Sequence, residues 1–230
     1  MALRQLLLRR VVRQFGNPTG PGGHIAGSIM GWRSSNRRRS RWAVNLLDVQ
    51  PTDRVIEFGC GPGVAVAALA GRATCGVVVG VDHSQVMIGQ ARRRNRAAVD
   101  AGRVKLVHAP VERLHTTDGP FDAALAVNTV GFWTDPVARL REIGRVLHPG
   151  GRIALVSQPR CPGATAAASA AAGDELAALA AEAGFANLRV KTLDLDPPAV
   201  CVLAINPGRL PDPVIPDTRT PNVVASNTED

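Results

Sequence analysis

The sequence predicts an α/β protein whose doubly wound, mainly parallel sheet is covered by helices on both faces, giving three αβα layers. Two observations lead to this prediction. Short apolar runs alternate along the chain with segments of helical periodicity, and a run of closely spaced glycines follows the first predicted strand. With 230 residues, 45% of them hydrophobic, the chain is long enough to form one such domain with a substantial core.

Strands are expected where short apolar runs lie between turn signals. They cover residues 54–58, 76–81, 104–107, 121–127, 152–157, 188–195 and 199–205. Helices are expected over residues 42–49, 64–70, 84–99, 135–147 and 174–183. Asp135 and Pro136 supply a cap and a proline at the first helical position. Because only a short turn joins the last two strands, we expect them to pair in antiparallel fashion.

The chain divides into a basic N-terminal arm or cap, a folded domain and a proline-rich tail that we expect to be disordered. These parts cover residues 1–47, 48–205 and 206–230. Within the arm, residues 3–15 have the periodicity of an amphipathic helix, and residues 24–41 are rich in Gly and Arg and are expected to be irregular. Residues 161–173, rich in Ala, Gly and Ser, are predicted to form a flexible lid.

The net charge of +8 belongs to the arm, because residues 1–47 hold nine Arg and no acidic residue, leaving the remainder near −1. A near-neutral body with only 3% aromatic residues argues against a nucleic-acid partner. The basic N-terminal helix leaves open a weak contact with a membrane surface, and the Arg run at 37–39 is typical of a solvated face. No apolar run approaches the ~18 residues that a transmembrane helix needs. The sequence indicates no oligomeric state.

The cysteines indicate thiols in a reducing compartment. Cys60, Cys75, Cys161 and Cys201 lie far apart, and no pair has the C-x-x-C spacing of a metal or redox site. We therefore expect no bound metal and a cytoplasmic location.

The segment VIEFGCGPGVAV, residues 55–66, carries the strongest functional signal. Glycines directly after a strand let the chain turn sharply and let a ligand approach the backbone. No Lys follows them as in a phosphate-binding P-loop, and the third glycine comes one residue too early for G-x-G-x-x-G. The pattern that remains is E-x-G-x-G-x-G, from Glu57 to Gly63. A carboxylate before the glycines repels phosphate but accepts a neutral or cationic ligand.

Asp82 supplies a second carboxylate, at the end of the next predicted strand. The ends of neighbouring parallel strands meet at one edge of a sheet, so Asp82 is expected beside the glycine loop, where it can accept hydrogen bonds from two ribose hydroxyls. Asp82 alone also fits a nicotinamide dinucleotide. Together with Glu57 and the shortened glycine spacing, it favours a positively charged nucleoside with an amino-acid tail.

Four segments in this order resemble the motifs of class I S-adenosylmethionine-dependent methyltransferases. They are VIEFGCGPGVAV, VVVGVDHS, FDAALAVNTVGFWTDP and LREIGRVLHPGGRIALVS. The resemblance runs from residue 53 to 157 and, more loosely, to 205. It implies a Rossmann-like sheet of seven strands with an antiparallel last strand, and S-adenosylmethionine as the cofactor.

The resemblance also implies which positions contact the cofactor. They are Glu57, Gly59, Cys60, Gly61, Gly63, Asp82, His83, Pro110, Val111 and Asn128. The glycines flank its methionine part, and Glu57 acts near its amino group. Asp82 holds the ribose and His83 packs by the adenine. Asn128 lines the end at which the methyl group is transferred.

The chain departs from the family at Pro110, where the family often has the Asp of a Gly-Asp-Ala triplet that takes the adenine amino group. Proline has neither a carboxylate nor an N–H donor. We expect the backbone of Val111 to pair with adenine instead, and the cofactor to be held more weakly or differently there.

The expected function is methyl transfer to a small-molecule acceptor, with His24 and Trp133 as candidate substrate contacts. No side chain is assigned as a catalytic base, which favours an acceptor that is already nucleophilic. Two alternatives stay open: an RNA or protein methyltransferase, and a non-catalytic relative that binds the cofactor or a partner. The first lacks the [DNS]-P-P-[YFW] run after the fourth strand that amino-group methylation of bases uses.

Overall fold

The computed structural model describes residues 34–113, 119–159 and 163–208. The predicted helix over 3–15, the candidate residue His24, Cys161 and the tail from residue 209 onward lie outside the described residues.

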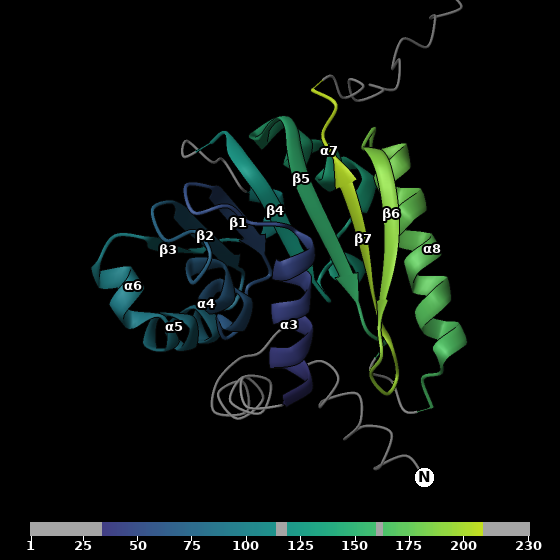
Figure 1. Ribbon diagram of the computed structural model, residues 1–230, viewed down its shortest axis with the longest axis horizontal. Coiled ribbons are helices and arrows are strands. Elements are labelled where there is room, and N and C mark those ends of the chain that lie inside the picture. Colours follow the sequence, from purple (N-terminus) through teal and green to yellow (C-terminus); the bar gives the residue numbers. More distant parts are fainter. Residues whose placement is uncertain (1–33, 114–118, 160–162, 209–230) are drawn as a thin grey trace, which may run out of the picture.

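Seven strands form one sheet in the order β3-β2-β1-β4-β5-β7-β6 (Figure 1). The strands are β1 (Arg54–Phe58), β2 (Val77–Asp82), β3 (Val104–His108), β4 (Phe121–Val127), β5 (Leu147–Ser157), β6 (Ala186–Leu193) and β7 (Ala199–Ile205). Pairs within the first five strands are parallel, whereas β7 runs antiparallel to both of its neighbours, β5 and β6. The predicted fold class, including the antiparallel last strand, is confirmed.

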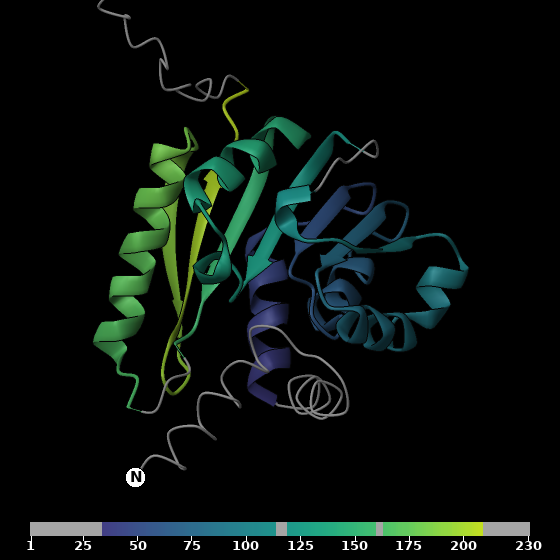
Figure 2. The same ribbon diagram turned by 180° about the vertical axis from the view of Figure 1, so that it is seen from behind.

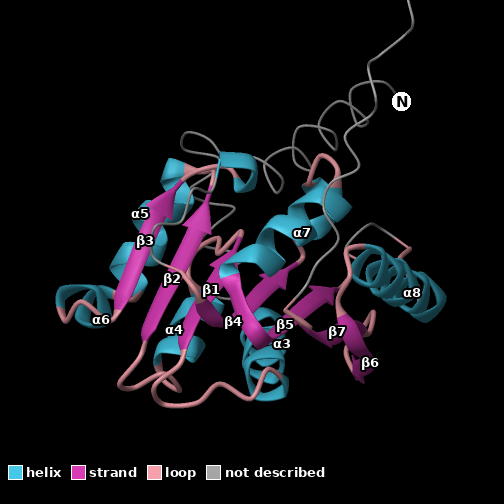
Figure 3. Ribbon diagram, turned by 90° about the horizontal axis from the view of Figure 1, so that it is seen from above, coloured by secondary structure: helices cyan, strands magenta, loops and turns pink. Residues whose placement is uncertain are grey.

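Helices cover both faces of this sheet. They are α3 (Ser34–Leu46), α4 (Val64–Ala70), α5 (Gln85–Arg94), α6 (Arg96–Asp100), α7 (Pro136–Val146) and α8 (Ala166–Glu182), with short 3-10 turns η1 (Val111–Arg113) and η2 (Val130–Phe132). Figure 3 shows α3 and α4 on one side of the sheet and α7 and α8 on the other. None of the helices in the described part of the chain is long and apolar enough to cross a membrane.

Two apolar clusters form the core, one on each face of the sheet. In β1, Val55 belongs to the cluster under α3, α4 and α5, and the next residue, Ile56, belongs to the cluster under α7 and α8. Both side chains are fully buried. Successive side chains of a strand point to opposite faces, so a strand covered on both sides reads as a continuous apolar run. This is why the strands were recognisable in the sequence.

The N-terminal side of the domain differs from the prediction. A helix was expected only from Trp42, with irregular chain before it, but α3 begins at Ser34. Its last turns bury Ala43 and Val44 against the sheet, followed by Leu47. Arg has a high helix propensity, so the Arg-rich stretch continues the helix that these apolar residues anchor. The folded domain therefore extends before the boundary drawn at residue 48.

The predicted lid is also corrected, because α8 already begins at Ala166 and takes in most of residues 161–173. The Thr165 hydroxyl accepts a hydrogen bond from the Ala168 N–H at 3.2 Å and caps the helix. An Ala-rich sequence has the highest intrinsic helix propensity, which outweighs its low complexity. Figure 2 shows α8, in green, lying along β6 and β7.

Two other element boundaries differ from those predicted from the sequence. The helix predicted over residues 84–99 is interrupted at Asn95, which separates α5 from α6. Strand β5 begins at Leu147 rather than at residue 152, with an irregularity in its pairing with β4.

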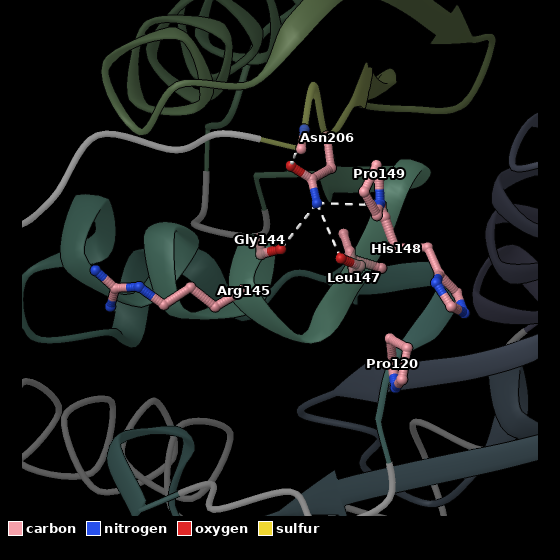
Figure 4. A pocket seen from close by; sticks show the side chains of 8 residues that line it. Pro120, Gly144, Arg145, Leu147, His148, Pro149 and Asn206 are labelled. Atoms are coloured by element: carbon pink, nitrogen blue, oxygen red, sulfur yellow. Dashed lines mark hydrogen bonds between the residues drawn. The ribbon is translucent and has the colours of Figure 1, made fainter.

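Asn206 ends the folded domain at the edge where the parallel strands begin (Figure 4). Its side-chain Nδ2 donates to the carbonyls of Gly144, Leu147 and His148 at 2.9, 3.0 and 3.1 Å, and its Oδ1 accepts from the Gly208 N–H at 3.1 Å. Only 2% of Asn206 is exposed. The domain therefore includes Asn206, which the sequence had placed in the disordered tail.

Candidate cofactor and methyl-transfer site

The glycine loop between β1 and α4 has the left-handed backbone that its composition predicts. Gly59, Gly61 and Gly63 have φ values of 69°, 52° and 74°, a region that side-chain-bearing residues rarely adopt. The loop is held by Cys60 N–H donating to Val81 O at 2.9 Å and Gly63 N–H donating to Cys60 O at 3.0 Å. Its conformation is thus fixed by its own turn and by β2.

The three glycines serve different purposes. A Cβ on Gly59 would lie 2.8 Å from the Cβ of Thr129, and one on Gly63 would lie 2.9 Å from the backbone of Ala91. These two positions need glycine because neighbouring chain packs against them. A Cβ on Gly61 would meet nothing within 4 Å. Gly61 therefore leaves open space above the loop, which is where a ligand can approach the backbone.

Asp82 ties the glycine loop to the end of β2, as the strand order predicted. Its Oδ2 accepts from the Gly61 N–H and its Oδ1 from the Ser84 N–H, both at 2.8 Å. Asp82 is 7% exposed. Each carboxylate oxygen can accept more than one hydrogen bond, so both keep capacity for ligand hydroxyls. The sequence did not predict this second role of Asp82, in which its carboxylate fixes the glycine loop.

Glu57 lies below the loop and is almost completely buried, with 2% of its surface exposed. The Val66 N–H, in the first turn of α4, hydrogen-bonds to its carboxyl group. Burial, and secondly the nearby charge of Asp82, raise the pKa of Glu57 well above its ordinary value of 4.5. Its Oε2 has no hydrogen-bond partner within the part of the chain that the structure describes. A buried acceptor of this kind is suited to a cationic or N–H-bearing ligand group.

Cys60, between the first two glycines, is buried, and burial followed by the charges of Glu57 and Asp82 raises the pKa of its thiol. A thiol with a raised pKa stays protonated and is a poor nucleophile. At this position only its main chain is suited to binding a ligand.

Asn128 follows β4 and has a left-handed backbone, with φ of 54°. Its N–H donates to Val156 O at 2.8 Å and its Oδ1 accepts from the Gln158 N–H at 2.7 Å, so it joins the ends of β4 and β5. The next residue, Thr129, packs against Gly59 of the glycine loop. Asn128 therefore lies next to the residue that borders the loop.

Trp133 is half-buried and meets Phe58 edge-on, with 6.4 Å between the ring centroids and 78° between the planes. It is packed into the core cluster beneath α7. Phe132 is the aromatic residue that is exposed in this loop, by 66%. Trp133 was the predicted substrate contact, whereas the only hint of Phe132 in the sequence is its position next to Trp133.

The remaining predicted contacts lie after β2 and β3. The His83 ring is 43% exposed, with Nδ1 3.9 Å from Asp82 Oδ1. The Ala109 N–H donates to Asp82 O at 3.0 Å and brings the segment after β3 to the same edge. Pro110 is half-buried, and Val111 begins η1, so the Val111 N–H has no partner inside that turn. The adenine contacts of His83, Pro110 and Val111 stay predictions.

These residues fit S-adenosylmethionine. Open space over Gly61, carboxylate capacity at Asp82 and the unpartnered, buried Oε2 of Glu57 lie at one edge of the sheet. This is the carboxyl edge of the parallel strands, where ligands bind in open α/β sheets. A separate cavity of about 480 Å³ lies at the opposite edge, lined in part by Arg145, His148 and Asn206. Figure 4 shows Arg145 and His148 pointing away from each other, so the two side chains do not converge on a common ligand.

The fold is thus Rossmann-like with a site suited to a nucleoside, and comparison with known proteins shows what the chain resembles. Residues 56–155 match the family described as methyltransferase domain. The chain is 29% identical over 185 residues to an uncharacterized methyltransferase, YdaC, of Bacillus subtilis, covering 80% of this chain and 99% of that protein. Residues 56–155 therefore carry a methyltransferase domain, and the relatives and the fold support an S-adenosylmethionine-dependent enzyme of class I.

Two further comparisons show how far the likeness extends. Over 130 residues the chain is 32% identical to the ubiquinone/menaquinone biosynthesis C-methyltransferase UbiE of Geobacter, covering 55% of each protein. It therefore spans about half the length of that relative. The fold matches the crystal structure of a SAM-dependent methyltransferase from Aquifex aeolicus with a TM-score of 0.61 and 16% identity, over 86% of this chain and 97% of the other.

Proposed function

We propose that this methyltransferase acts on a small, uncharged and partly apolar acceptor that is nucleophilic without help from the loop after β4. The observation that carries the proposal is the composition of residues 128–133, which follow β4 beside the glycine loop. This segment contains Asn128 and the exposed Phe132 but no titratable side chain. An exposed aromatic ring favours an apolar partner. The name of the quinone-biosynthesis relative, a C-methyltransferase, supports an acceptor of this kind.

Each group of the site has a part in this reaction. The cofactor supplies an electrophilic methyl group on a sulfonium. The glycine loop and Asp82 would hold the nucleoside, and Glu57 would lie near its cationic amino group. The segment after β4 would position the acceptor for methyl transfer. Such positioning can supply roughly 7–11 kcal/mol of the barrier, so a methyltransferase of this type needs no base when its acceptor is already nucleophilic.

A second candidate, an RNA or protein acceptor, is favoured by one feature of the surface. Arg37 and Arg38 on α3 and Arg92 and Arg93 on α5 are exposed, and both helices border α4, which follows the glycine loop. A basic surface there would hold a polyanion through contacts that salt weakens strongly.

Transfer of a labelled methyl group decides between these acceptors. The full chain is incubated with S-adenosylmethionine carrying a radioactive methyl group and with a cell extract that is then separated into low-mass, RNA and protein fractions. We expect the label in the low-mass fraction. The matched control is Gly61→Val, which places a side chain in the open space of the loop and should abolish labelling. Label in RNA or protein that depends on the intact loop would refute the small-molecule proposal.

A further inference from the structure

The structure contains a buried hydrogen-bonded chain that links α3 to the methyl-transfer end of the site. The Arg39 Nη1 donates to Gln158 Oε1 at 2.6 Å, and the Gln158 N–H donates to Asn128 Oδ1 at 2.7 Å. Arg39 is 5% exposed and Gln158 is 6% exposed. Residues 37–39 were predicted to form a solvated face, and for Arg39 this prediction is wrong.

The side chain of Gln158 is held at both ends. Its Oε1 accepts from Arg39, and its Nε2 donates to Pro197 O at 2.8 Å in the turn between β6 and β7. Arg39 is itself held by Nη2 donating to Asn36 Oδ1 at 2.9 Å, within the same helix. A planar guanidinium that makes two directed hydrogen bonds loses most of its freedom. The carboxyl end of β5 is thereby pinned between α3 and the last hairpin of the sheet.

This arrangement decides the polarity of Asn128. The Gln158 N–H is a donor, so the Asn128 atom that faces it must be the acceptor Oδ1. The Asn128 Nδ2 group is then the end left over, and it makes no hydrogen bond to any residue of the described ranges. Asn128 is half-buried, so this amide group is within reach of a ligand.

The backbone of Asn128 also needs support from its surroundings. A non-glycine residue at φ of 54° costs free energy and persists where neighbouring groups hold it. The bonds to Val156 and Gln158 are those that hold Asn128. Loosening Gln158 would therefore release both the backbone and the amide orientation of Asn128.

We propose that Arg39 and Gln158 are positioning residues of the methyl-transfer site, which hold the Asn128 Nδ2 group as a hydrogen-bond donor toward an oxygen atom of a bound ligand. The inference rests on the proposed function in one respect, that Asn128 lines the transfer end. It makes α3, which precedes the motifs of the family, a working part of the site. Arg39 and Gln158 act through Asn128 and touch no reacting atom.

The test uses the full chain labelled with ¹⁵N only at asparagine, and S-adenosylhomocysteine as the probe. The side-chain amide signals of Asn128 are assigned by their absence from the Asn128→Asp variant. We expect Arg39→Met and Gln158→Leu each to shift or broaden these signals in the free protein. Each should also weaken binding of the probe in calorimetry by about three- to thirtyfold. The double variant should bind no more weakly than about the weaker single variant, because both changes break one chain.

Arg38→Met is the matched control, an exposed arginine of the same helix, and it should leave both readouts as in the wild type. Gln158→Glu keeps the acceptor for Arg39 but loses the donor to Pro197 O, so it should recover only part of the affinity that Gln158→Leu loses. Unchanged Asn128 signals in both Arg39→Met and Gln158→Leu would overturn the proposal, as would additive losses in the double variant. If the wild type binds no probe, the function proposed above fails, and the amide signals of the free protein still decide whether the chain positions Asn128.

Discussion

Two asparagines at opposite edges of the sheet differ in how much of their hydrogen-bonding capacity the protein itself uses. Asn206 lies at the edge where the parallel strands begin. Its Nδ2 donates to three carbonyls and its Oδ1 accepts from an N–H. Asn128 lies at the carboxyl edge. Its Oδ1 accepts from the Gln158 N–H, while its Nδ2 has no hydrogen-bond partner among the described residues. The edge with the 480 Å³ cavity is the one whose buried amide is fully satisfied. We therefore expect unused hydrogen-bonding capacity, rather than the presence of a cavity, to mark the functional edge.

The largest effect is expected for Asn206→Ala, which leaves two buried carbonyls and one partly buried carbonyl without their shared donor. An unsatisfied buried polar group costs about 1–3 kcal/mol, and water entering the neighbouring cavity will recover part of this cost. We expect the free energy of unfolding to fall by about 2–4 kcal/mol in urea denaturation. Affinity for S-adenosylhomocysteine, measured on the folded protein, should stay unchanged. Loss of affinity without loss of stability would contradict the contrast between the two edges.

At the carboxyl edge, Glu57→Gln should act on binding instead. The substitution keeps the shape and an acceptor for the Val66 N–H but removes the negative charge that faces a cationic ligand. A hydrogen bond to a charged group contributes about 1.5–3 kcal/mol, so affinity for S-adenosylmethionine should fall roughly ten- to a hundredfold. Calorimetry of the two proteins at one pH and salt concentration measures this. Equal affinities would show that Glu57 serves only to support α4.

The same variant should change how stability depends on pH. The pKa of Glu57 is raised in the folded protein, chiefly by burial, so the folded state binds the proton more tightly than the unfolded chain does. The stabilisation of the folded state by this proton is fully present below pH 4.5, the ordinary pKa of a glutamate. It is lost as the pH rises through the pKa of Glu57 in the folded protein. Glu57→Gln should therefore be more stable than the wild type at pH 8 and lose that advantage in acid. Thermal melts of the free proteins from pH 4 to 9 test the sign.

A smaller effect on stability is expected for Gly61→Ala. The left-handed backbone at φ of 52° costs an alanine roughly 1–2 kcal/mol, but the new Cβ meets no neighbouring atom. Gly63→Ala is the matched comparison, because its Cβ would also press on Asn95 and Ala91, and it should destabilise more. Both variants are compared by urea denaturation. Equal losses would mean that the space above Gly61 is not open.

The smallest effect is expected for His148→Ala, in the cavity of the opposite edge. His148 is exposed and contributes its carbonyl, not its ring, to the Asn206 contacts. Stability should change by less than about 0.5 kcal/mol, as is usual for exposed positions. Methyl transfer to the acceptor found in the low-mass fraction should continue at the wild-type rate. A clear loss of turnover would assign a function to this cavity.

The sheet and the glycine loop could be predicted because their signals are local. Continuous apolar runs define the strands, and the spacing of Gly59, Gly61 and Gly63 defines the loop. The Asp135 cap also has a local signature, and it is confirmed by the hydrogen bond that its Oδ1 accepts from the Ala138 N–H. These features depend on neighbours within a few residues of each other.

What could not be predicted depends on partners that are distant in the sequence. Nothing near Arg39 shows that Gln158, 119 residues later, will bury and orient it. Nothing near Asn206 indicates three carbonyls about 60 residues earlier. The start of α3 was missed because an Arg-rich stretch has no apolar periodicity. The start of α8 was missed because low complexity was read as flexibility, although Ala favours helix.

Hydrogen–deuterium exchange with and without S-adenosylhomocysteine tests the central claim, that the carboxyl edge with its unused polar groups is the working site, most directly. We predict slower exchange in peptides that contain the glycine loop, residues 59–66, and the segment 128–133, with no change around residues 144–151 and Asn206. Protection at Asn206 and its cavity, with none in the glycine loop, would contradict the account.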